Sequence, residues 1–181
     1  MARILFLNPS VEKYGRTPIG ITTYSGLLKK GGHKVRLFDT TFLDTDYLFN
    51  KMSKAATEKQ EEFVFYQKIN TKSNQFEKEK VNVIQKLNNT IKSFKPDIIA
   101  FSMWSCMLTG EDEYRMLERG LTLLRKCKRG NYLVVVGGIV PSLNSEKIIK
   151  NPLVDIVCAG EGEYAFLDLA KKIDAHKLKA I

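Results

Sequence analysis

Five short apolar runs recur along the chain, and segments with a helical pattern separate most of them. Apolar runs with little polar interruption are typical of parallel strands that are covered on both faces. The runs at residues 4–7, 98–101, 133–136 and 154–158 fit this description. The run at residues 34–38 instead places charged residues between apolar ones, which indicates an edge strand with one wetter face.

The predicted helices combine apolar stripes with charges that suit the ends of a helix. One stripe includes Tyr24 and stops at Gly31-Gly32, a common way to end a helix. Another runs over residues 114–124, with acidic residues before it and basic residues at its end, as the helix dipole favours. The last predicted helix covers about residues 161–173.

The segment from Asp44 to Phe94 is far longer than an ordinary crossover between strands. Its second half predicts an amphipathic helix, which Lys95-Pro96 ends because a residue before proline avoids the helical conformation. The apolar positions of that helix are Phe76, Val83, Leu87, Ile91 and Phe94. The pattern leaves open whether this insertion packs on its own domain or covers a neighbour.

Alternation of strands and helices with right-handed crossovers predicts an α/β fold with a doubly wound parallel sheet. An edge-like second strand beside a buried first strand favours the flavodoxin-like order 2-1-3-4-5. We therefore expect a five-stranded domain over residues 1–175 with a helical insertion at about 44–94. Residues 176–181 would begin a linker.

Composition supports one cytoplasmic domain. The chain has 181 residues, 44% of them apolar, which suffices for one sizeable core. No apolar run approaches the roughly 20 residues of a membrane span, and the N-terminus lacks the apolar stretch of a signal peptide. The net charge is +9, but the lysines are spread from Lys13 to Lys179. Spread charge does not make a nucleic-acid footprint, so neither membrane nor nucleic acid is an expected partner.

The sequence lacks the residue patterns of several common kinds of site. The three cysteines, Cys106, Cys127 and Cys158, form no CxxC, which argues against a disulfide framework and a zinc site. Neither GxGxxG after the first strand nor a phosphate-binding GxxxxGK[ST] is present. The two histidines, His33 and His176, are expected at the surface, and His33 would lie at the sheet edge away from any ligand. We predict no catalytic residue and no metal ligand.

A ligand of such a sheet binds beyond the carboxyl ends of the strands. The loop over residues 102–108 is apolar there, so it needs cover from either a partly apolar ligand or the insertion. Glycines in the next two loops would let backbone approach a ligand and leave N–H groups for phosphate or amide oxygens. A tight turn and a strand-to-helix bend explain the same glycines: Gly137, Gly138, Gly160 and Gly162.

Taken in order, these loops resemble the cobalamin-binding domain at the N-terminus of class B radical SAM enzymes. That family includes cobalamin-dependent methyltransferases and the anaerobic magnesium-protoporphyrin ester cyclase group. The resemblance extends from the first strand to about Ala170 and is most specific where GG follows one strand and GEGE the next. The matching segments are NP–GRTPIG, FDTT, PDIIAFS, VVVGGIVPS and VDIVCAGEGE.

The resemblance implies that the domain holds cobalamin against the carboxyl-end face of the sheet, with the nucleotide tail in the sheet crevice. It implies no catalysis by this domain alone. The partner would be a radical SAM barrel that carries CxxxCxxC, a [4Fe–4S] cluster and S-adenosylmethionine. The residues expected near the cofactor are Ser102, Met103, Trp104, Gly137, Gly138, Ile139, Gly160, Glu161 and Gly162.

Two departures from related families shape this expectation. The DxHxxG motif of methionine-synthase-type domains is absent after the first strand, so no protein histidine should ligate cobalt. CxxxCxxC is also absent, so we expect the chain to be a fragment of a methyltransferase or cyclase.

Two alternatives remain open. An RNA-modifying methylthiotransferase N-terminal domain would supply three cysteines from carboxyl-end loops, where this sequence places only Cys106. A vestigial or non-catalytic Rossmann-like interaction or receiver module is the other, although a receiver would need acidic residues where Asn8 and Ser102 stand.

Overall fold

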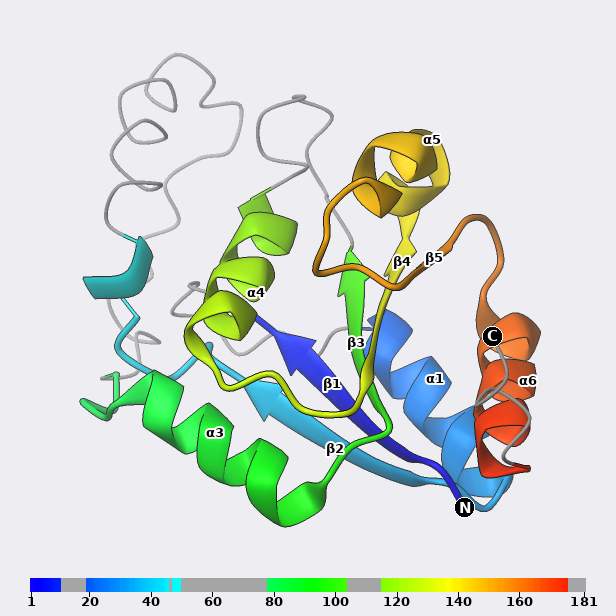
Figure 1. Ribbon diagram of the computed structural model, residues 1–181, viewed down its shortest axis with the longest axis horizontal. Coiled ribbons are helices and arrows are strands. Elements are labelled where there is room, and N and C mark those ends of the chain that lie inside the picture. Colours follow the sequence, from blue (N-terminus) through cyan, green and yellow to red (C-terminus); the bar gives the residue numbers. More distant parts are fainter. Residues whose placement is uncertain (11–18, 46, 50–77, 104–114, 176–181) are drawn as a thin grey trace, which may run out of the picture.

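The computed structural model describes residues 1–10, 19–45, 47–49, 78–103 and 115–175. Within them, five parallel strands form one sheet in the order β2-β1-β3-β4-β5, shown in Figure 1. This confirms the predicted α/β, flavodoxin-like fold and its strand order. The strands are β1 (Arg3–Asn8), β2 (Lys34–Asp39), β3 (Ile98–Met103), β4 (Leu133–Gly138) and β5 (Ile156–Cys158).

The burial of each strand follows its position in the sheet. Strand β1, which lies inside the sheet between β2 and β3, is buried from Ile4 to Asn8, because helices cover both of its faces. Strand β2 pairs only with β1 among the described strands and exposes Lys34 and Arg36, so the predicted edge strand is confirmed. Strand β5 is shorter than the apolar run at 154–158, because pairing with β4 begins at Ile156.

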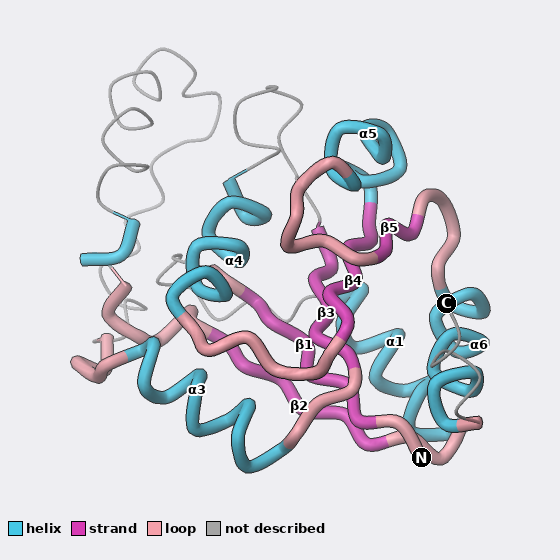
Figure 2. Tube along the Cα trace, viewed as in Figure 1, coloured by secondary structure: helices cyan, strands magenta, loops and turns pink. Residues whose placement is uncertain are grey.

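Two layers of helices enclose the sheet, because successive side chains of each strand point to opposite faces. Helices α1 (Ile19–Lys30) and α6 (Glu163–Asp174) pack on the face that presents Ile4 and Phe6. The opposite face, which presents Leu5 and Leu7, is covered by α3 (Val83–Phe94), α4 (Arg115–Lys126) and α5 (Ile139–Ile149). Figure 2 shows the strands between these two groups of helices.

The predicted stop of the first helix is confirmed in detail. The N–H of Gly32 donates to the Lys29 carbonyl at 3.0 Å, and the N–H of His33 donates to the Leu28 carbonyl at 3.0 Å. This pair of bonds is the Schellman motif, which needs a left-handed residue, and Gly32 supplies it with φ +81°. The chain then enters β2 directly.

Helix α3 packs on its own domain, which answers the open question for the last part of the insertion. Val83 and Leu87 are fully buried in the core on the β1 Leu5 face. The Asn82 side chain caps the start of the helix by accepting a hydrogen bond from the Gln85 N–H at 3.0 Å. The helix ends where predicted, before Lys95-Pro96. Residues 50–77, including Phe76, lie outside the described part of the chain.

Helix α5 was not predicted from the sequence. Its apolar pattern is irregular because Asn144 leaves the helical conformation, with φ −135° and ψ 33°, and kinks the helix. Val140, Pro141 and Ile148 are nevertheless buried. Pro141 is tolerated because it lies in the first turn, where a backbone N–H has no partner within the helix.

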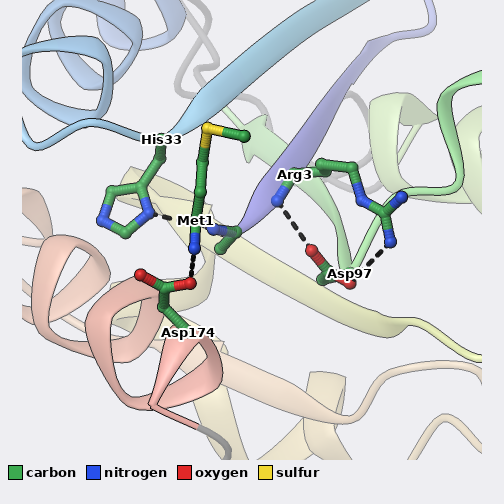
Figure 3. Close-up of polar contacts among 6 residues, drawn as sticks. Met1, Arg3, His33, Asp97 and Asp174 are labelled. Carbon is green, nitrogen blue, oxygen red and sulfur yellow. Dashed lines mark hydrogen bonds and ion pairs between the residues drawn. The ribbon is translucent and has the colours of Figure 1, made fainter.

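The expectation that His33 lies at the surface is wrong. Its side chain is 6% exposed, and its Nδ1 accepts a hydrogen bond from the Ala2 N–H at 3.2 Å. Figure 3 shows it beside the amino group of Met1, which pairs with Asp174. His33 does lie at the amino-end edge of the sheet. Burial lowers the pKa of His33, and the Met1 amino group and Lys171 lower it further.

No helix among the described residues is long and apolar enough to cross a membrane.

Candidate functional site

The structure brings together the predicted site residues that it describes at the carboxyl-end edge. Ser102 pairs with Gly137 and Met103 with Gly138, at the ends of β3 and β4. Ile139 begins α5 directly after β4. Gly160, Glu161 and Gly162 form the connection from β5 to α6. Trp104 lies outside the described residues, as does Cys106.

Ser102 lies where the first turn of α1 meets the end of β3. A Cβ added to Gly20 would lie 2.6 Å from Ser102 Oγ, so Gly20 lets the helix approach the strand this closely. The chain reverses its winding direction between β1 and β3, which makes this the switch point of the sheet. Ser102 therefore stands where an open α/β sheet binds its ligand.

The sheet itself requires a glycine at position 138, whereas contact between its backbone and a ligand stays a prediction. Its φ is +112°, and an added Cβ would collide with the backbone carbonyl of Met103 on the neighbouring strand. Gly137 differs, because an added Cβ there would meet the Cys158 Cβ at 3.5 Å, an ordinary contact. Of these two glycines, only Gly137 has room for a side chain.

Ser142, which sequence reasoning missed, ties the two glycine-containing loops together. Its hydroxyl donates to the Gly138 carbonyl at 2.8 Å and accepts from the Gly160 N–H at 2.8 Å. The Gly160 N–H is therefore already used, contrary to the expectation that it is left for a ligand. The signal in the sequence was a serine four residues after Gly138, because a hydroxyl one helical turn after a strand end can hydrogen-bond to the backbone of that strand end.

The NP and FDTT segments form a polar network at the ends of β1 and β2. Asn8 Nδ2 donates to Asp39 Oδ1 at 3.1 Å, and Thr41 Oγ1 donates to the same oxygen at 2.6 Å. The hydroxyl of Thr40 donates to the Ser10 carbonyl at 2.7 Å. Asn8, Thr40 and Thr41 are buried, so these side chains fix the strand ends.

A narrow crevice opens between the carboxyl ends of the strands and the layer formed by α1 and α6. Its free volume is about 20 Å³. The walls are mostly apolar, and strands β1, β3, β4 and β5 contribute together with both helices. The lining residues are Phe6, Tyr24, Ala100, Phe101, Ser102, Val135, Gly137, Cys158, Gly162 and Phe166.

Tyr24 contributes an aromatic wall to this crevice. Its ring stacks on Phe6 with centroids 6.3 Å apart and meets Phe166 edge-on at 5.7 Å. The sequence marked Tyr24 only as part of a helical stripe and did not connect it with Phe6 or Phe166. These three aromatic residues are distant in the sequence, so their contact could not be predicted from a local pattern.

The titratable groups of the crevice are held neutral. Burial raises the pKa of Tyr24, and the charge of Glu163 raises it further. Burial also raises the pKa of the Cys158 thiol, again with a contribution from Glu163. Since both groups ordinarily titrate well above pH 7, the crevice carries no charge from them at neutral pH. It suits an uncharged, apolar group.

Among the described residues, large apolar side chains are exposed where α1, α5 and α6 begin at the carboxyl-end edge, and we call the four that follow the apolar rim. Ile19 starts α1 and is 79% exposed, whereas Ile139 starts α5 and is 51% exposed. Leu143 in α5 and Tyr164 in the first turn of α6 are 73% and 82% exposed. Apolar side chains gathered around a crevice mark a surface that binds something.

The described cysteines lie at opposite edges of the sheet. Cys127 follows α4 at the amino-end edge and is buried, which raises its pKa to about 11. Cys158 ends β5 at the carboxyl-end edge. A cluster held by both thiols, as a methylthiotransferase-like arrangement would need, does not fit this placement.

Comparison with known proteins finds two solved structures of similar fold and one family model that matches the sequence. No curated protein matches the sequence. The radical S-adenosylmethionine methyltransferase TsrM from Kitasatospora setae, with tryptophan substrate and the SAM analogue aza-SAM bound, matches at 15% identity with a TM-score of 0.59. The same enzyme with cobalamin and a [4Fe–4S] cluster bound matches at 17% identity with a TM-score of 0.57.

Each match covers 97% of this chain but only 26% and 25% of the TsrM chains, so this chain spans about a quarter of their length. At these identities the likeness shows a shared fold. The family model described as the B12 binding domain matches residues 13–170, which include the loops after β2, β3, β4 and β5 and part of the connection after β1. The chain belongs to the B12-binding domain family.

Proposed function

We propose that this domain binds cobalamin over the carboxyl-end face of its sheet and presents it to a radical SAM barrel, without catalysing a reaction alone. The apolar rim is the observation that carries this proposal. A family of cobalamin-binding domains needs a surface for a broad, partly apolar ring, and Ile19, Ile139, Leu143 and Tyr164 offer one around the switch point.

The residues at this edge fit the corrin ring in chemistry. The exposed apolar side chains suit its rim and methyl groups, whereas Ser102 and the backbone around Gly162 offer polar contacts to its amide side chains. Glu161 is exposed beside them and completes the proposed rim of the site. When bound, the corrinoid would supply a cobalt centre that can carry a methyl group.

No histidine among the described residues can reach cobalt from this face, because His33 is buried at the opposite edge of the sheet. The part of this domain is therefore to bind and orient the ring. Its other face would be covered by the barrel, as the fold likeness to TsrM suggests. Without the barrel, only one face of the ring would contact protein, so we expect weak binding by this domain alone.

The test is a titration with hydroxocobalamin, followed by calorimetry and the visible spectrum, on the wild type and two matched variants. Ile139 and Ile149 lie at opposite ends of α5 and are similarly exposed, at 51% and 45%. Ile139→Asp should weaken binding by about tenfold or more, because it buries a carboxylate against the ring. Ile149→Asp should leave binding unchanged, because it lies at the amino-end edge.

Aspartate at position 139 also favours the N-terminus of α5, so lost binding could not be ascribed to a weakened helix. Absence of binding by the wild type at about 1 mM protein would contradict the proposal. Equal effects of the two variants would place the cofactor elsewhere on the molecule.

A further inference from the structure

The connection from β5 to α6 carries part of the proposed site, yet burial does little to hold its first half in place. Strand β5 pairs with β4 over three residues, from Ile156 to Cys158. Ala159, Gly160 and Glu161 then lie exposed beyond the sheet. In Figure 1 the connection leads from β5 to α6, so it joins the helix layer that contains α5 to the layer that contains α6.

A hydroxyl group fastens this connection to α5. Ser142 Oγ accepts a hydrogen bond from the Gly160 N–H at 2.8 Å and donates one to the Gly138 carbonyl at 2.8 Å. A serine hydroxyl has one hydrogen to donate, and the Gly138 carbonyl takes it. Both bonds are exposed to solvent, so without the hydroxyl the two backbone groups would bond to water instead. Ser142 therefore matters more for the position of the connection than for the folding of the domain.

Gly160 has the backbone conformation that this bond uses. Its φ is +82°, in the left-handed region that glycine adopts without the steric cost of a side chain. An added Cβ would meet no atom within 4 Å, so crowding does not fix this residue. Gly162, two residues later, is buried and lies against Tyr24 and Cys158. Packing thus holds the far end of the connection, and the Ser142 hydroxyl holds its middle.

The same bond joins two halves of the apolar rim. Ile139 and Leu143 flank Ser142 in α5, whereas Tyr164 follows the connection in the first turn of α6. A rigid ring that touches both halves binds best when their separation is set beforehand, because ordering a loose loop on binding costs affinity. A hydroxyl between the halves is suited to set that separation.

We propose that Ser142 is a positioning residue, which fixes the connection against α5 so that both halves of the apolar rim form one preformed surface for the corrin ring. The proposal rests on the proposed function, because it concerns the same cofactor at the same face. Ser142 acts through the Gly160 backbone and donates no hydrogen bond to the cofactor. Removing its hydroxyl should weaken binding while the domain stays folded.

The experiment measures hydroxocobalamin binding by calorimetry for the wild type, Ser142→Ala, Ser142→Thr and Ser93→Ala. Ser142→Ala should bind about tenfold or more weakly. Ser142→Thr keeps the hydroxyl, and its extra methyl group has room at an exposed position, so its affinity should stay within about threefold of the wild type. Ser93→Ala is the matched control, because the exposed Ser93 hydroxyl also donates to a helix carbonyl, that of Thr90 at 3.2 Å, but lies in α3 at the amino-end edge.

Two further measurements follow the hydrogen bond and the fold separately. Hydrogen exchange of the Gly160 amide, measured by NMR without cofactor, should become about tenfold faster in Ser142→Ala and stay unchanged in Ser142→Thr and Ser93→Ala. The midpoint of thermal unfolding of Ser142→Ala should stay within about 3 °C of the wild type, because the lost bonds are at the surface. A larger fall would make Ser142 a residue of the folded framework and overturn the positioning role.

The outcomes distinguish this inference from the proposed function. Binding by none of the four proteins would overturn the proposed function, whereas Gly160 exchange would still report on the hydrogen bond. Binding by the wild type and Ser142→Ala with equal affinity would overturn the role of Ser142 alone. So would an unchanged Gly160 exchange rate in Ser142→Ala, or a loss of binding that Ser142→Thr or Ser93→Ala shares, because the hydroxyl would then not be what holds the site.

Discussion

Two adjacent glycines at the end of β4 should respond in opposite ways to the same substitution. Gly138 has φ +112° and ψ −168°, a region that only glycine adopts at little cost. An alanine there adds about 1–3 kcal/mol of backbone strain. Its Cβ also collides with the Met103 carbonyl, and relieving that contact by shifting β4 from β3 adds roughly 1–3 kcal/mol.

We therefore expect Gly138→Ala to lower the free energy of unfolding by about 4 kcal/mol, a large part of the 5–15 kcal/mol typical of a domain. Gly137→Ala should change it by less than about 1 kcal/mol, because its Cβ would meet Cys158 at van der Waals distance. Urea unfolding followed by circular dichroism measures both. With a slope of about 2 kcal/mol/M, the midpoint of Gly138→Ala should fall by about 2 M.

Equal midpoints for the two variants, or a larger loss for Gly137→Ala, would refute this reading of the β3–β4 contact. The prediction also affects the choice of binding variants. A substitution such as Gly138→Val would disturb the sheet, so a loss of binding by that variant would not report on the ligand.

Two further predictions concern stability away from the carboxyl-end edge. Folding lowers the pKa of His33 below its ordinary 6.5, so the unfolded chain binds more protons once the pH falls below about 6.5. Stability should thus be constant above that pH and decline below it, and His33→Leu should reduce the decline measured by urea unfolding between pH 7.5 and pH 5. Leu87→Ala should cost about 2–5 kcal/mol because Leu87 is fully buried, whereas Lys92→Ala on the exposed side of α3 should change stability by less than about 0.5 kcal/mol. A similar small effect of both α3 variants would mean that the helix is not part of the core.

The sheet was predictable because its strands are local apolar runs and its edge strand carries Lys34 and Arg36 at alternate positions. The end of α1 at Gly31-Gly32 was equally local. Helix α5 was not predictable, because the kink at Asn144 breaks the periodicity on which such a prediction depends. The domain boundary at residue 175 stays a prediction, since residues 176–181 are outside the described part of the chain.

The candidate site was predictable in place and only partly in detail. Parallel topology sends every strand end to one edge, which is why Ser102, Gly137 and Gly162 meet there. What each glycine does depends on neighbours from other strands, so the sequence could not show that Gly138 lies directly against the Met103 backbone. The burial of His33 follows from its packing against the chain start and α6, a tertiary contact that no local pattern reveals.

The central claim is that a corrinoid binds the carboxyl-end face, and amide NMR of the labelled domain during a hydroxocobalamin titration tests it most directly. Shifts should concentrate on Ser102, Gly137, Ile139 and Gly162, with little change at amino-edge residues such as His33. Shifts confined to the amino-end edge, or to the groove lined by Asn88 and Lys126 between α3 and α4, would contradict the account.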